Sequence, residues 1–401
     1  MKLGDLVTIV GGGTPSRQIA TFWNGSIPWI SVKDFNSERI VSAYETITIE
    51  GLENSASRLI PKGSIIVPTR MALGKVAIND IDVAINQDLK ALLIKENEKL
   101  DYEYLFFYIK SRGKYLESSG KGATVKGISV KELADLEVPL PSLQIQRKIA
   151  SVLSIANSLI HKRKQAIAKL DELVQSVFFE MFGDLAKNDK KWNFLRLDET
   201  ASITSGVTKG KKYNNVNLIK VPYMRVANVQ DGYIDLREIK EIEVSMDDYE
   251  RYRLMNGDVL LTEGGDPDKL GRGAVWQSEI ENCIHQNHIF RVRVNADMLN
   301  PYYLAACTSS SYGKRYFLKM AKQTTGIATI NMTQLKNFPV PLPPLSMQNE
   351  FEKKKKEIEM IKTQMLSQLA KLEQNFQNLL HQAFTGKLQF ATERETIAVK
   401  R

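Results

Sequence analysis

The sequence predicts an α+β protein in which two mixed α/β domains are separated by two long helices that pack on each other antiparallel. The main observation is an internal repeat, because Val138-Pro139-Leu140-Pro141 recurs as Val340-Pro341-Leu342-Pro343, 202 residues later. Each copy precedes a long polar stretch whose apolar residues have heptad spacing. A solenoid repeat has only roughly 20 to 50 residues, so the chain is a duplicated two-part unit with pseudo-two-fold character.

The repeat divides the 401-residue chain into five consecutive segments. A first domain is followed by a central helix, and a second domain is followed by a C-terminal helix and a short tail. Both domains fit the usual size of roughly 100 to 200 residues. The expected boundaries are residues 1–141 for the first domain, 142–184 for the central helix, 185–343 for the second domain, 344–387 for the C-terminal helix and 388–401 for the tail.

The two domains also resemble each other, although a drifting offset between them indicates loop insertions. Short β-branched runs bounded by Gly, Pro and Asn are typical of strands, and a helical stretch precedes each proline segment. We therefore expect a mixed α/β fold in both domains. The matching pairs are Ile27-Pro28-Trp29 with Val221-Pro222-Tyr223, Gly63-Ser64-Ile65 with Gly257-Asp258-Val259, Leu73-Gly74-Lys75 with Leu270-Gly271-Arg272, and Ile85-Asn86-Gln87 with Ile284-His285-Gln286.

Each long helix is expected to cover roughly 38 residues, or about 57 Å at 1.5 Å per residue. Its apolar stripe is a heptad seam with one additional step of four, a local stutter. Because neither helix buries this stripe alone, we expect the two helices to pack together, with Arg163 as the charged exception. The alternative is a homodimeric coiled coil. The seam residues are Ala156, Leu159, Arg163, Ile167, Leu170, Val174, Val177 and Met181, and then Ile358, Ile361, Met365, Leu369, Leu372, Phe376, Leu379 and Ala383.

Composition argues against membrane, disulfide-rich and metal-dependent classes. No apolar run approaches the roughly 20 residues of a membrane-spanning helix, and the N-terminus lacks the apolar core of a signal peptide. Cys283 and Cys307 are too few for a disulfide framework and lack zinc-binding spacing. His285 and His288 would point to opposite faces of a strand, so no metal site is expected. We expect a cytoplasmic protein without membrane contact.

The formal net charge of +9 favours nucleic acid only weakly, because the charges within residues 1–141 balance. A stronger signal is a basic cluster before each Val-Pro-Leu-Pro, with a local charge of +4 over residues 110–132 and +5 over residues 311–336. Each cluster contains a polar loop of the kind that follows a DNA backbone. The structural alternative is that helix C-termini attract Lys and Arg through the helix dipole.

The motifs of the chain favour binding over catalysis. Gly11-Gly12-Gly13-Thr14-Pro15-Ser16 lacks the Walker pattern and is expected to be a turn whose glycines adopt positive φ. Its basic counterpart, residues 205–212, could also contact phosphate, with a solvated loop as the alternative. Asn300-Pro301-Tyr302-Tyr303 is close to the base-flipping loop of amino-methyltransferases. Its match in the first half, Asp101-Tyr102-Glu103-Tyr104, favours helix N-caps instead, so we expect no enzyme.

The chain resembles the specificity subunit of type I restriction-modification systems. The resemblance rests on two variable domains alternating with two similar long helices, on Pro-Leu-Pro before each helix, and on Lys2-Leu3-Gly4-Asp5 and Gly12-Gly13-Thr14-Pro15-Ser16 near the start. It covers essentially the whole chain. It implies that residues 1–141 and about 185–343 are target-recognition domains, each reading one half of a bipartite, asymmetric site in double-stranded DNA. The helices would set the spacing and dock methyltransferase subunits.

The same resemblance implies partners that carry out the chemistry. Two methyltransferase subunits would supply the S-adenosylmethionine reaction, and two restriction subunits would supply ATP-driven translocation and cleavage with Mg²⁺, so the chain itself would hold no cofactor. One departure concerns the turn after Pro-Leu-Pro, which in the family often continues to Glu-Gln. Here only the glutamines, Gln146 and Gln348, are kept, which leaves a role for the acidic residue in doubt.

We expect base readout from loops around Arg70 and Lys75 in the first domain, and around Glu263, Arg272 and Lys212 in the second. Arg and Lys suit guanine, whereas Glu accepts from cytosine N4. Target bases and spacer length depend on loop geometry and DNA shape, for which the sequence has no motif. The competing hypotheses are a non-DNA scaffold protein with two ligand-binding domains on a coiled-coil rod, and a DNA enzyme with an unrecognised site. The candidate DNA-binding residues are Arg17, Arg70, Lys75, Lys121, Lys126, Lys209, Lys211, Lys212, Glu263, Arg272, Lys322 and Gln323.

Overall fold

The computed structural model describes residues 1–122, 126–213, 217–266, 270–324 and 327–388, without the side chains of residues 323, 324 and 327. The chain forms two compact units, and each unit contains one globular domain together with part of both long helices. The first unit combines Met1–Lys164 with Ser367–Arg401, whereas the second is the continuous stretch Gln165–Leu366. Within the described residues, no helix is both long enough and apolar enough to cross a membrane.

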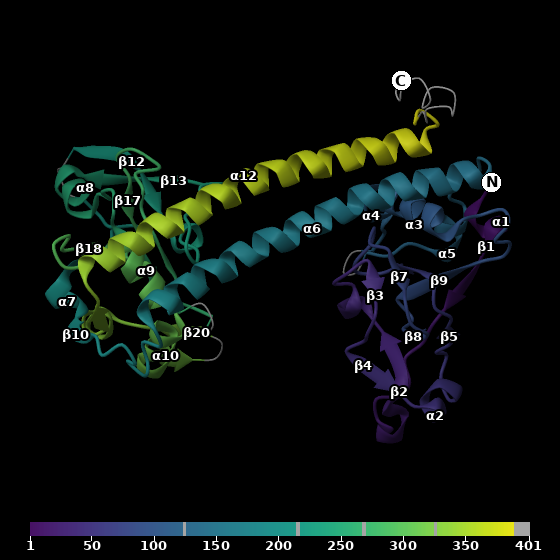
Figure 1. Ribbon diagram of the computed structural model, residues 1–401, viewed down its shortest axis with the longest axis horizontal. Helices are drawn as coiled ribbons and strands as arrows, with labels where there is room; N and C mark the ends of the chain where they lie inside the picture. Colours follow the sequence, from purple (N-terminus) through teal and green to yellow (C-terminus); the bar gives the residue numbers. More distant parts are fainter. Residues whose placement is uncertain (123–125, 214–216, 267–269, 325–326, 389–401) are drawn as a thin grey trace, which may run out of the picture. The chain divides into compact units, whose positions relative to one another are not determined.

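The first domain contains two β-sheets in its described part (Figure 1). The larger sheet has the order β1-β9-β6-β7-β3, and the smaller has the order β4-β2-β8-β5. The strands are β1 (Val7–Gly11), β2 (Trp23–Ile30), β3 (Arg39–Ile40), β4 (Glu45–Ile47), β5 (Leu59–Ile60), β6 (Ile65–Pro68), β7 (Ala77–Asn79), β8 (Val83–Ile85) and β9 (Leu89–Ile94). The helices are α1 (Leu3–Leu6), η1 (Ala20–Phe22), η2 (Val32–Asp34), α2 (Ile49–Glu53), α3 (Tyr102–Ser111), α4 (Gly113–Ser119) and α5 (Val130–Ala134).

The second domain has four sheets in its described part, with the orders β11-β18-β14-β16, β13-β12-β17, β15-β20-β19 and β10-β21. Its strands are β10 (Asn193–Arg196), β11 (Ala201–Ser205), β12 (Leu218–Met224), β13 (Lys240–Ser245), β14 (Val259–Thr262), β15 (Gly264–Gly265), β16 (Gly273–Val275), β17 (Ile284–His285), β18 (Ile289–Val294), β19 (Lys322–Thr324), β20 (Ile327–Thr329) and β21 (Pro339–Leu342). Its helices are α7 (Leu197–Thr200), η3 (Val226–Asn228), α8 (Met246–Tyr252), α9 (Pro301–Ser309), α10 (Ser311–Met320) and α11 (Met332–Lys336).

The duplication in the sequence is also present in the topology. The order β1-β9-β6-β7 corresponds to β11-β18-β14-β16, and β4-β2-β8 corresponds to β13-β12-β17. The registers agree as well, since Val7 pairs with Ile94 in the first domain and Ala201 pairs with Val294 in the second. The predicted fold class, two mixed α/β domains with two long antiparallel helices in a pseudo-two-fold repeat, is confirmed.

The central strands of both domains are buried on two faces, which explains their unbroken apolar sequences. In β6, Ile65 belongs to the core that α3 shares with the long helices, whereas Ile66 belongs to the core shared with the smaller sheet. In β14, Val259 and Leu260 divide between two cores in the same way. Because successive strand residues point to opposite faces, each central strand joins two layers.

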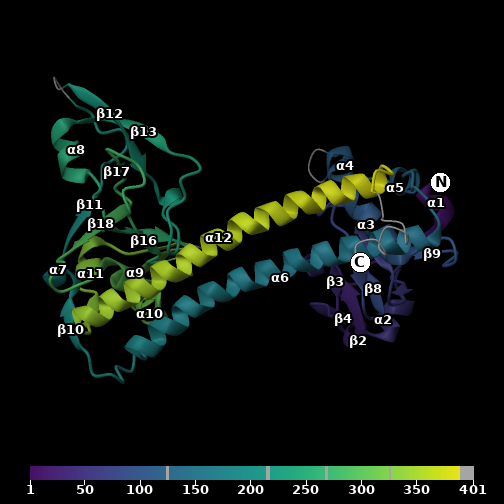
Figure 2. The same cartoon turned by 45° about the horizontal axis from the view of Figure 1, so that its top comes forward.

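Two 40-residue helices, α6 (Leu143–Phe182) and α12 (Leu345–Phe384), follow the two Pro-Leu-Pro segments. In the first unit, the N-terminal part of α6 and the C-terminal part of α12 lie side by side against α3 (Figures 1 and 2), where the rings of Phe107 and Phe376 are 6.2 Å apart. In the second unit, the remaining parts pack against α9, where Phe178 and Phe351 are 5.3 Å apart. The two helices run antiparallel within each unit.

The apolar seam between the helices differs from the prediction at one heptad position, which occurs once in each helix. Leu159 and Ile361, which we expected in the seam, are exposed, and their neighbours Ile160 and Lys362 lie at the seam instead. With these positions, steps of four and three alternate without a stutter. The prediction was wrong because it required an apolar residue of α12 at every heptad position, whereas α12 has a lysine at this one. The other predicted positions are buried or half-buried, namely Ala156, Arg163, Ile167, Leu170, Val174, Val177, Met181, Ile358, Met365, Leu369, Leu372, Phe376, Leu379 and Ala383.

Polar residues in the seam have partners on the opposite helix. Within the first unit, the guanidinium of Arg163 donates to the side-chain carbonyl of Gln368. Within the second unit, Nζ of Lys362 donates to the carboxylate of Asp171. A polar group that finds its partner in only one alignment of two helices fixes their register, at some cost in stability.

A buried glutamine near the start of each long helix attaches the helix to its domain. Gln146 accepts a hydrogen bond from the backbone N–H of Asp101 at 3.0 Å and donates to the carbonyl of Pro141 at 2.9 Å. Gln348 likewise accepts from Asn300 at 2.8 Å. Asp101 and Asn300 cap α3 and α9, so the predicted N-cap roles are confirmed. The glutamine that survives from the Glu-Gln pattern therefore joins three segments in each half.

The first unit has a second polar link between its domain and α6. Lys110 of α3 donates to the carboxylate of Glu38 and to the side-chain oxygen of Asn157, which itself donates to Glu38 at 2.7 Å. His161 Nε2 lies 3.7 Å from the same carboxylate. Burial opposes ionisation of Glu38, but Lys110 and Asn157 outweigh it and hold the pKa of this carboxyl below its usual range.

Candidate nucleic-acid interface

The glycine-rich loop of the first domain is packed against the core. Gly11, Gly12 and Gly13 do not adopt positive φ, so that prediction was wrong. The glycines are needed for close approach instead, because a Cβ on Gly12 would lie 1.8 Å from the carbonyl oxygen of Ile85. In the second domain, a Cβ on Gly206 would lie 2.0 Å from the carbonyl oxygen of His285. The two loops are therefore equivalent in packing, and their glycines serve the fold.

Arg17 makes its contacts within the first domain. Its guanidinium donates to both carboxylate oxygens of Glu45, one of them at 2.9 Å, and lies 3.7 Å over the ring of Trp23. The hydrogen bond from Arg17 lowers the pKa of Glu45. This cation–π and ion-pair contact holds the glycine-rich loop on the smaller sheet. A phosphate would have to compete with Glu45 for Arg17.

The basic loop of the second domain is only partly engaged. Lys211 donates to Asp248 at 2.6 Å, and the hydroxyl of Tyr213 donates to the same oxygen at 2.5 Å. Lys209 and Lys212 are exposed. Of the three predicted lysines, Lys211 is thus held by a carboxylate at α8, whereas the other two lie on the surface.

Two predicted base-contacting residues, Lys75 and Arg272, occupy equivalent places, and each donates a hydrogen bond within its own domain. Nζ of Lys75 donates to the carbonyl of Phe35 at 3.3 Å, just beyond η2. Nη1 of Arg272 donates to the side-chain oxygen of Gln230 at 3.3 Å, just beyond η3. These contacts fasten a turn to the loop beside it in each domain.

The structure brings Arg70 together with the basic loop that precedes the first long helix. Arg70 and Lys121 both form bridges to the backbone of Gly127, and Ile128 donates to the carbonyl of Thr69 at 3.0 Å. Lys121 is 85% exposed and lies 3.4 Å from Glu132. Lys126, next to Gly127, is also exposed. Three of the predicted cations thus surround one backbone ladder, although they are far apart in the sequence.

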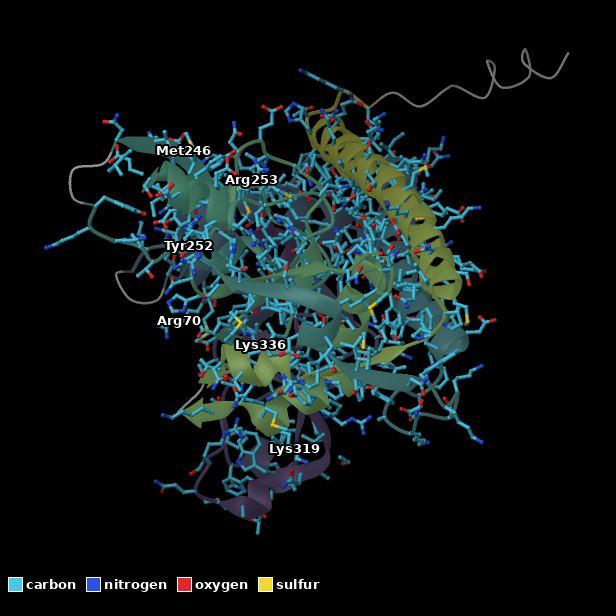
Figure 3. The ribbon with its side chains drawn as sticks, turned by 90° about the vertical axis from the view of Figure 1, so that its left-hand side faces the viewer. Arg70, Met246, Tyr252, Arg253, Lys319 and Lys336 are labelled. Atoms are coloured by element: carbon cyan, nitrogen blue, oxygen red, sulfur yellow. The ribbon has the colours of Figure 1, made fainter. Side chains whose placement is uncertain are left out.

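The second domain repeats this ladder as the sheet β15-β20-β19. Ile330 donates to the carbonyl of Glu263 at 2.9 Å, as Ile128 does to Thr69 in the first domain. Lys322 begins β19 and is exposed, whereas the side chain of Gln323 lies outside the described residues. Lys319 of α10 and Lys336 of α11 flank this sheet (Figure 3).

The structure corrects the alignment of the two halves by one residue. Ile85 pairs with Ile30, and His285 pairs with Met224, at equivalent places in the two smaller sheets. Ile85 therefore corresponds to His285, and the predicted match with Ile284 was wrong. Apolar residues alternate poorly in such short strands, so the sequence alone did not fix the register. His285 is fully buried, and burial lowers its pKa to about 3.

Two functional candidates, Asp88 and His288, were missed for this reason. With the corrected register they occupy one equivalent position, beside Arg70 in the first domain and Glu263 in the second. Nη1 of Arg70 lies 4.0 Å from Oδ1 of Asp88, and Nδ1 of His288 lies 2.6 Å from Oε2 of Glu263. An alignment of the repeat at an offset of 200 residues would have paired them.

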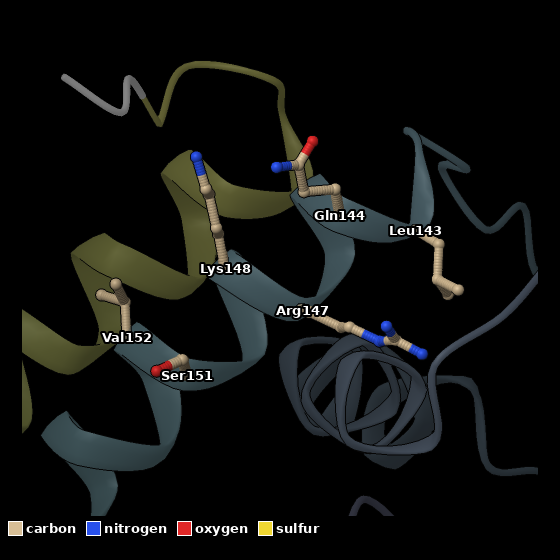
Figure 4. Close-up of a pocket in the computed structure, with 6 residues that line it drawn as sticks. All are labelled: Leu143, Gln144, Arg147, Lys148, Ser151 and Val152. Carbon is tan, nitrogen blue, oxygen red and sulfur yellow. The ribbon is translucent and has the colours of Figure 1, made fainter. Parts of the chain in front are cut away.

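The long helices also keep surface outside the seam. An open depression lies over the first turns of α6 (Figure 4), and it is lined by Leu143, Gln144, Arg147, Lys148, Ser151 and Val152. A second depression lies over α12 between Asn349 and Met360, slightly farther from the start of that helix. Large apolar side chains are exposed farther along both helices, including Ile155 and Leu159 on α6 and Met360, Ile361 and Leu366 on α12. Exposed apolar side chains grouped in this way are typical of protein interaction surfaces.

The chain belongs to the type I restriction-modification DNA specificity family. The model of that family, described as the type I restriction modification DNA specificity domain, matches residues 1–170 and 189–378. Both matched segments combine one globular domain with most of the helix that follows it. The family assignment predicted from the motifs is therefore confirmed.

Individual relatives agree with this assignment. The MjaIX specificity subunit of a type I restriction enzyme from Methanocaldococcus jannaschii is 26% identical over 372 residues, which cover 87% of this chain and 84% of that protein. Among solved structures, the S subunit of a type I restriction-modification system from M. genitalium has a TM-score of 0.53 at 15% identity, covering 98% of this chain and 96% of that one.

A second solved chain comes from work on complex assembly and conformational transition of the type I restriction-modification system. It has a TM-score of 0.59 at 21% identity and covers 97% of both chains. At these identities the two structures establish a common fold. None of these comparisons supports a non-DNA scaffold protein.

Proposed function

We propose that this chain is the DNA-recognition subunit of a type I restriction-modification complex, in which each globular domain reads one half of a bipartite, asymmetric site. One observation carries the proposal. The two domains share a backbone ladder, Thr69 with Ile128 and Glu263 with Ile330, yet they present different side chains around it. A common framework with different exposed groups is what two readers of two different half-sites need.

The candidate residues divide into phosphate contacts and base contacts. We assign phosphate contact to the exposed lysines, and the loops that carry them can follow a DNA backbone. We assign base contact to the strand ends that carry Arg70 and Glu263. Arg17, Lys75, Lys211 and Arg272 have partners inside their domains and make a smaller contribution. The phosphate group comprises Lys121, Lys126, Lys209, Lys212 and Lys322, with Gln323 adjacent to it in sequence.

The two long helices set the distance between the half-sites and bind partner subunits. Their bounds correspond without a gap at an offset of 202 residues, which supports a role as a spacer of fixed length. Their exposed apolar residues and the depressions over their N-terminal halves support the docking of two methyltransferase subunits. Methylation with S-adenosylmethionine, and ATP- and Mg²⁺-dependent cleavage by two restriction subunits, then take place on the partners and not on this chain.

The proposal is tested by binding DNA to the complex of this chain with its methyltransferase partner at several salt concentrations. We expect affinity for a bipartite sequence to fall steeply with salt. The double variant K121Q/K126Q should lower the salt dependence by about 0.9 per lost phosphate contact in a plot of log affinity against log salt. It should leave the preferred sequence unchanged.

A matched control is Lys62→Gln, because Lys62 is an exposed lysine that precedes the same strand, β6, at the end opposite Arg70. This variant should bind as the unaltered complex does. A complex that prefers no bipartite sequence, whatever the salt concentration, would contradict the proposed function.

A further inference from the structure

An acidic and a basic side chain meet at the end of the central strand in both domains. In the first domain, the backbone N–H of Thr69 donates to the carbonyl of Asp88 at 2.8 Å. In the second, the N–H of Glu263 donates to the carbonyl of His288 at 3.0 Å. These bonds lie beside the ladders that join Thr69 and Glu263 to the loops before the long helices. The two contacts therefore lie on one backbone framework, in which Glu263 stands at the place of Thr69 and Arg70 is one residue farther along.

The polarity of the pair is reversed between the domains. In the first domain the cation, Arg70, follows β6 and the carboxylate, Asp88, precedes β9. In the second domain the carboxylate, Glu263, follows β14 and its imidazole partner, His288, precedes β18. Acid and base have thus exchanged strands while the backbone contacts between those strands are kept.

In both domains the basic side chain is outward and the acidic one is more buried. The side chain of Arg70 is 65% exposed, whereas that of Asp88 is 12% exposed. The side chain of His288 is 56% exposed, whereas that of Glu263 is 31% exposed. A carboxylate beneath an exposed basic group restricts its motion before any ligand arrives, which lowers the ordering cost of binding.

The surroundings of Asp88 keep it in place. Its backbone N–H donates to Oδ1 of Asn86 at 3.1 Å, and Lys90 lies beside it on β9. The backbone of Gly127 stands on the other side of Arg70, where a Cβ would come within 3.3 Å of Arg70 Cγ. Arg70 thus lies between this carboxylate and a glycine, and its guanidinium remains accessible.

We propose that Arg70 and His288 are the side chains that read base edges, and that Asp88 and Glu263 are positioning residues that hold them. This inference rests on the proposed function and makes it more specific. A guanidinium presents two parallel donors and matches the O6 and N7 acceptors of guanine. With Nδ1 of His288 engaged by Glu263, only Nε2 of the imidazole reaches a base, so the second domain makes a single contact there. The two domains therefore offer different readouts from the same end of the central sheet.

The experiment is to map methylated sequences in cells that express the full complex with each variant. Arg70→Lys keeps the charge but loses the paired donors, so we expect discrimination at one base of the first half-site to fall about ten- to hundredfold. Asp88→Asn should relax that same base to a smaller extent. His288→Ala and Glu263→Gln should relax one base of the second half-site and leave the first unchanged.

The outcomes separate this inference from the proposed function. If the unaltered complex methylates a bipartite sequence and the Arg70→Lys and His288→Ala complexes methylate the same sequence equally strictly, the inference is wrong and the proposed function stands. If Asp88→Asn lowers methylation at all sequences alike, Asp88 is merely structural, which also contradicts it. Co-purification of each variant with the methyltransferase subunit verifies folding, and Lys62→Gln serves as the control.

Discussion

At the scale of single residues, buried polar groups decide how each domain is attached to its helices. Gln146 and Gln348 satisfy the same backbone groups in the two units, so their role is shared. Glu38 is specific to the first unit, where Lys110 and Asn157 satisfy its carboxylate. A buried charge that loses one partner is strongly destabilising, because its desolvation is no longer compensated.

Glu38 should make the first unit sensitive to acid. Its folded-state pKa lies below its usual value, which is about 4.3 in an unfolded chain, so its stabilising contribution is present above about pH 4.3 and is lost as the pH falls through the folded-state pKa. We expect Glu38→Gln to melt at a lower temperature than the unaltered chain at pH 7. The difference should shrink as the pH is lowered toward 3.

Thermal unfolding between pH 7 and pH 3 measures this effect. Glu50→Gln is a suitable control, because Glu50 is an exposed carboxylate on α2 and should change the melting temperature little at any pH. A difference between Glu38→Gln and the unaltered chain that is the same at every pH would show that the carboxylate charge is not the cause.

At the scale of elements, the two long helices carry charged residues at different levels of one seam. Arg163 stands where α12 has Met365, and Lys362 stands where α6 has Ile160. Each has a partner on the opposite helix within its own unit. The seam is therefore apolar enough to hold the helices together and polar enough to resist a shift by one heptad.

Replacing Arg163 by methionine should stabilise the helix pair. Methionine already occupies the equivalent level of α12, and removing a half-buried charge should raise the free energy of unfolding by up to about 1 kcal/mol. Urea unfolding monitored by helical circular dichroism measures it. The reciprocal variant, Met365→Arg, should be destabilising, and Lys162→Met on the exposed face should be neutral. Equal effects of Arg163→Met and Lys162→Met would contradict a seam position for Arg163.

Helices and strands differed in how well the sequence predicted them. The helix after each Pro-Leu-Pro was predicted close to its observed bounds, because heptad spacing persists over many turns and a proline segment marks its start. Strand residues such as Ile85 and His285 were matched one position out of register, because short strands buried on both faces lack alternation. The contacts that place Asp88 and His288 depend on segments distant in the sequence, and no local pattern contains them. The sequence thus predicted the loops of the candidate site, whereas Asp88 and His288 were identified only in the structure.

At the scale of the whole molecule, the chain contains the same fold twice, and the two copies differ in their surface residues. Each unit has the same central strand order and an N-cap residue at the start of α3 or α9. In each unit a buried glutamine of the long helix accepts a hydrogen bond from the backbone N–H of that N-cap residue. The loops that connect the shared elements differ in length and charge between the two domains. A division of this kind lets recognition change without disturbing the framework.

Exchange of a single domain should therefore change a single half-site. We expect that replacing residues 1–141 by the corresponding domain of a relative alters one half of the methylated sequence and leaves the other half and the spacer as they were. Replacing residues 185–343 should have the reciprocal effect. Sequencing of methylated positions in the host genome is the measurement. A single exchange that altered both halves would show that the domains do not read independently.

The division of α12 between the units has a consequence for the order of folding during synthesis. Phe376, Leu380 and Phe384 complete the core around Tyr104 and Phe107, although they are made more than 260 residues later. The second unit, in contrast, is finished once Leu366 has left the ribosome. Domains made first generally fold first. Here the domain that is translated first must wait, with an open apolar surface on α3, until the C-terminal part of α12 has been made.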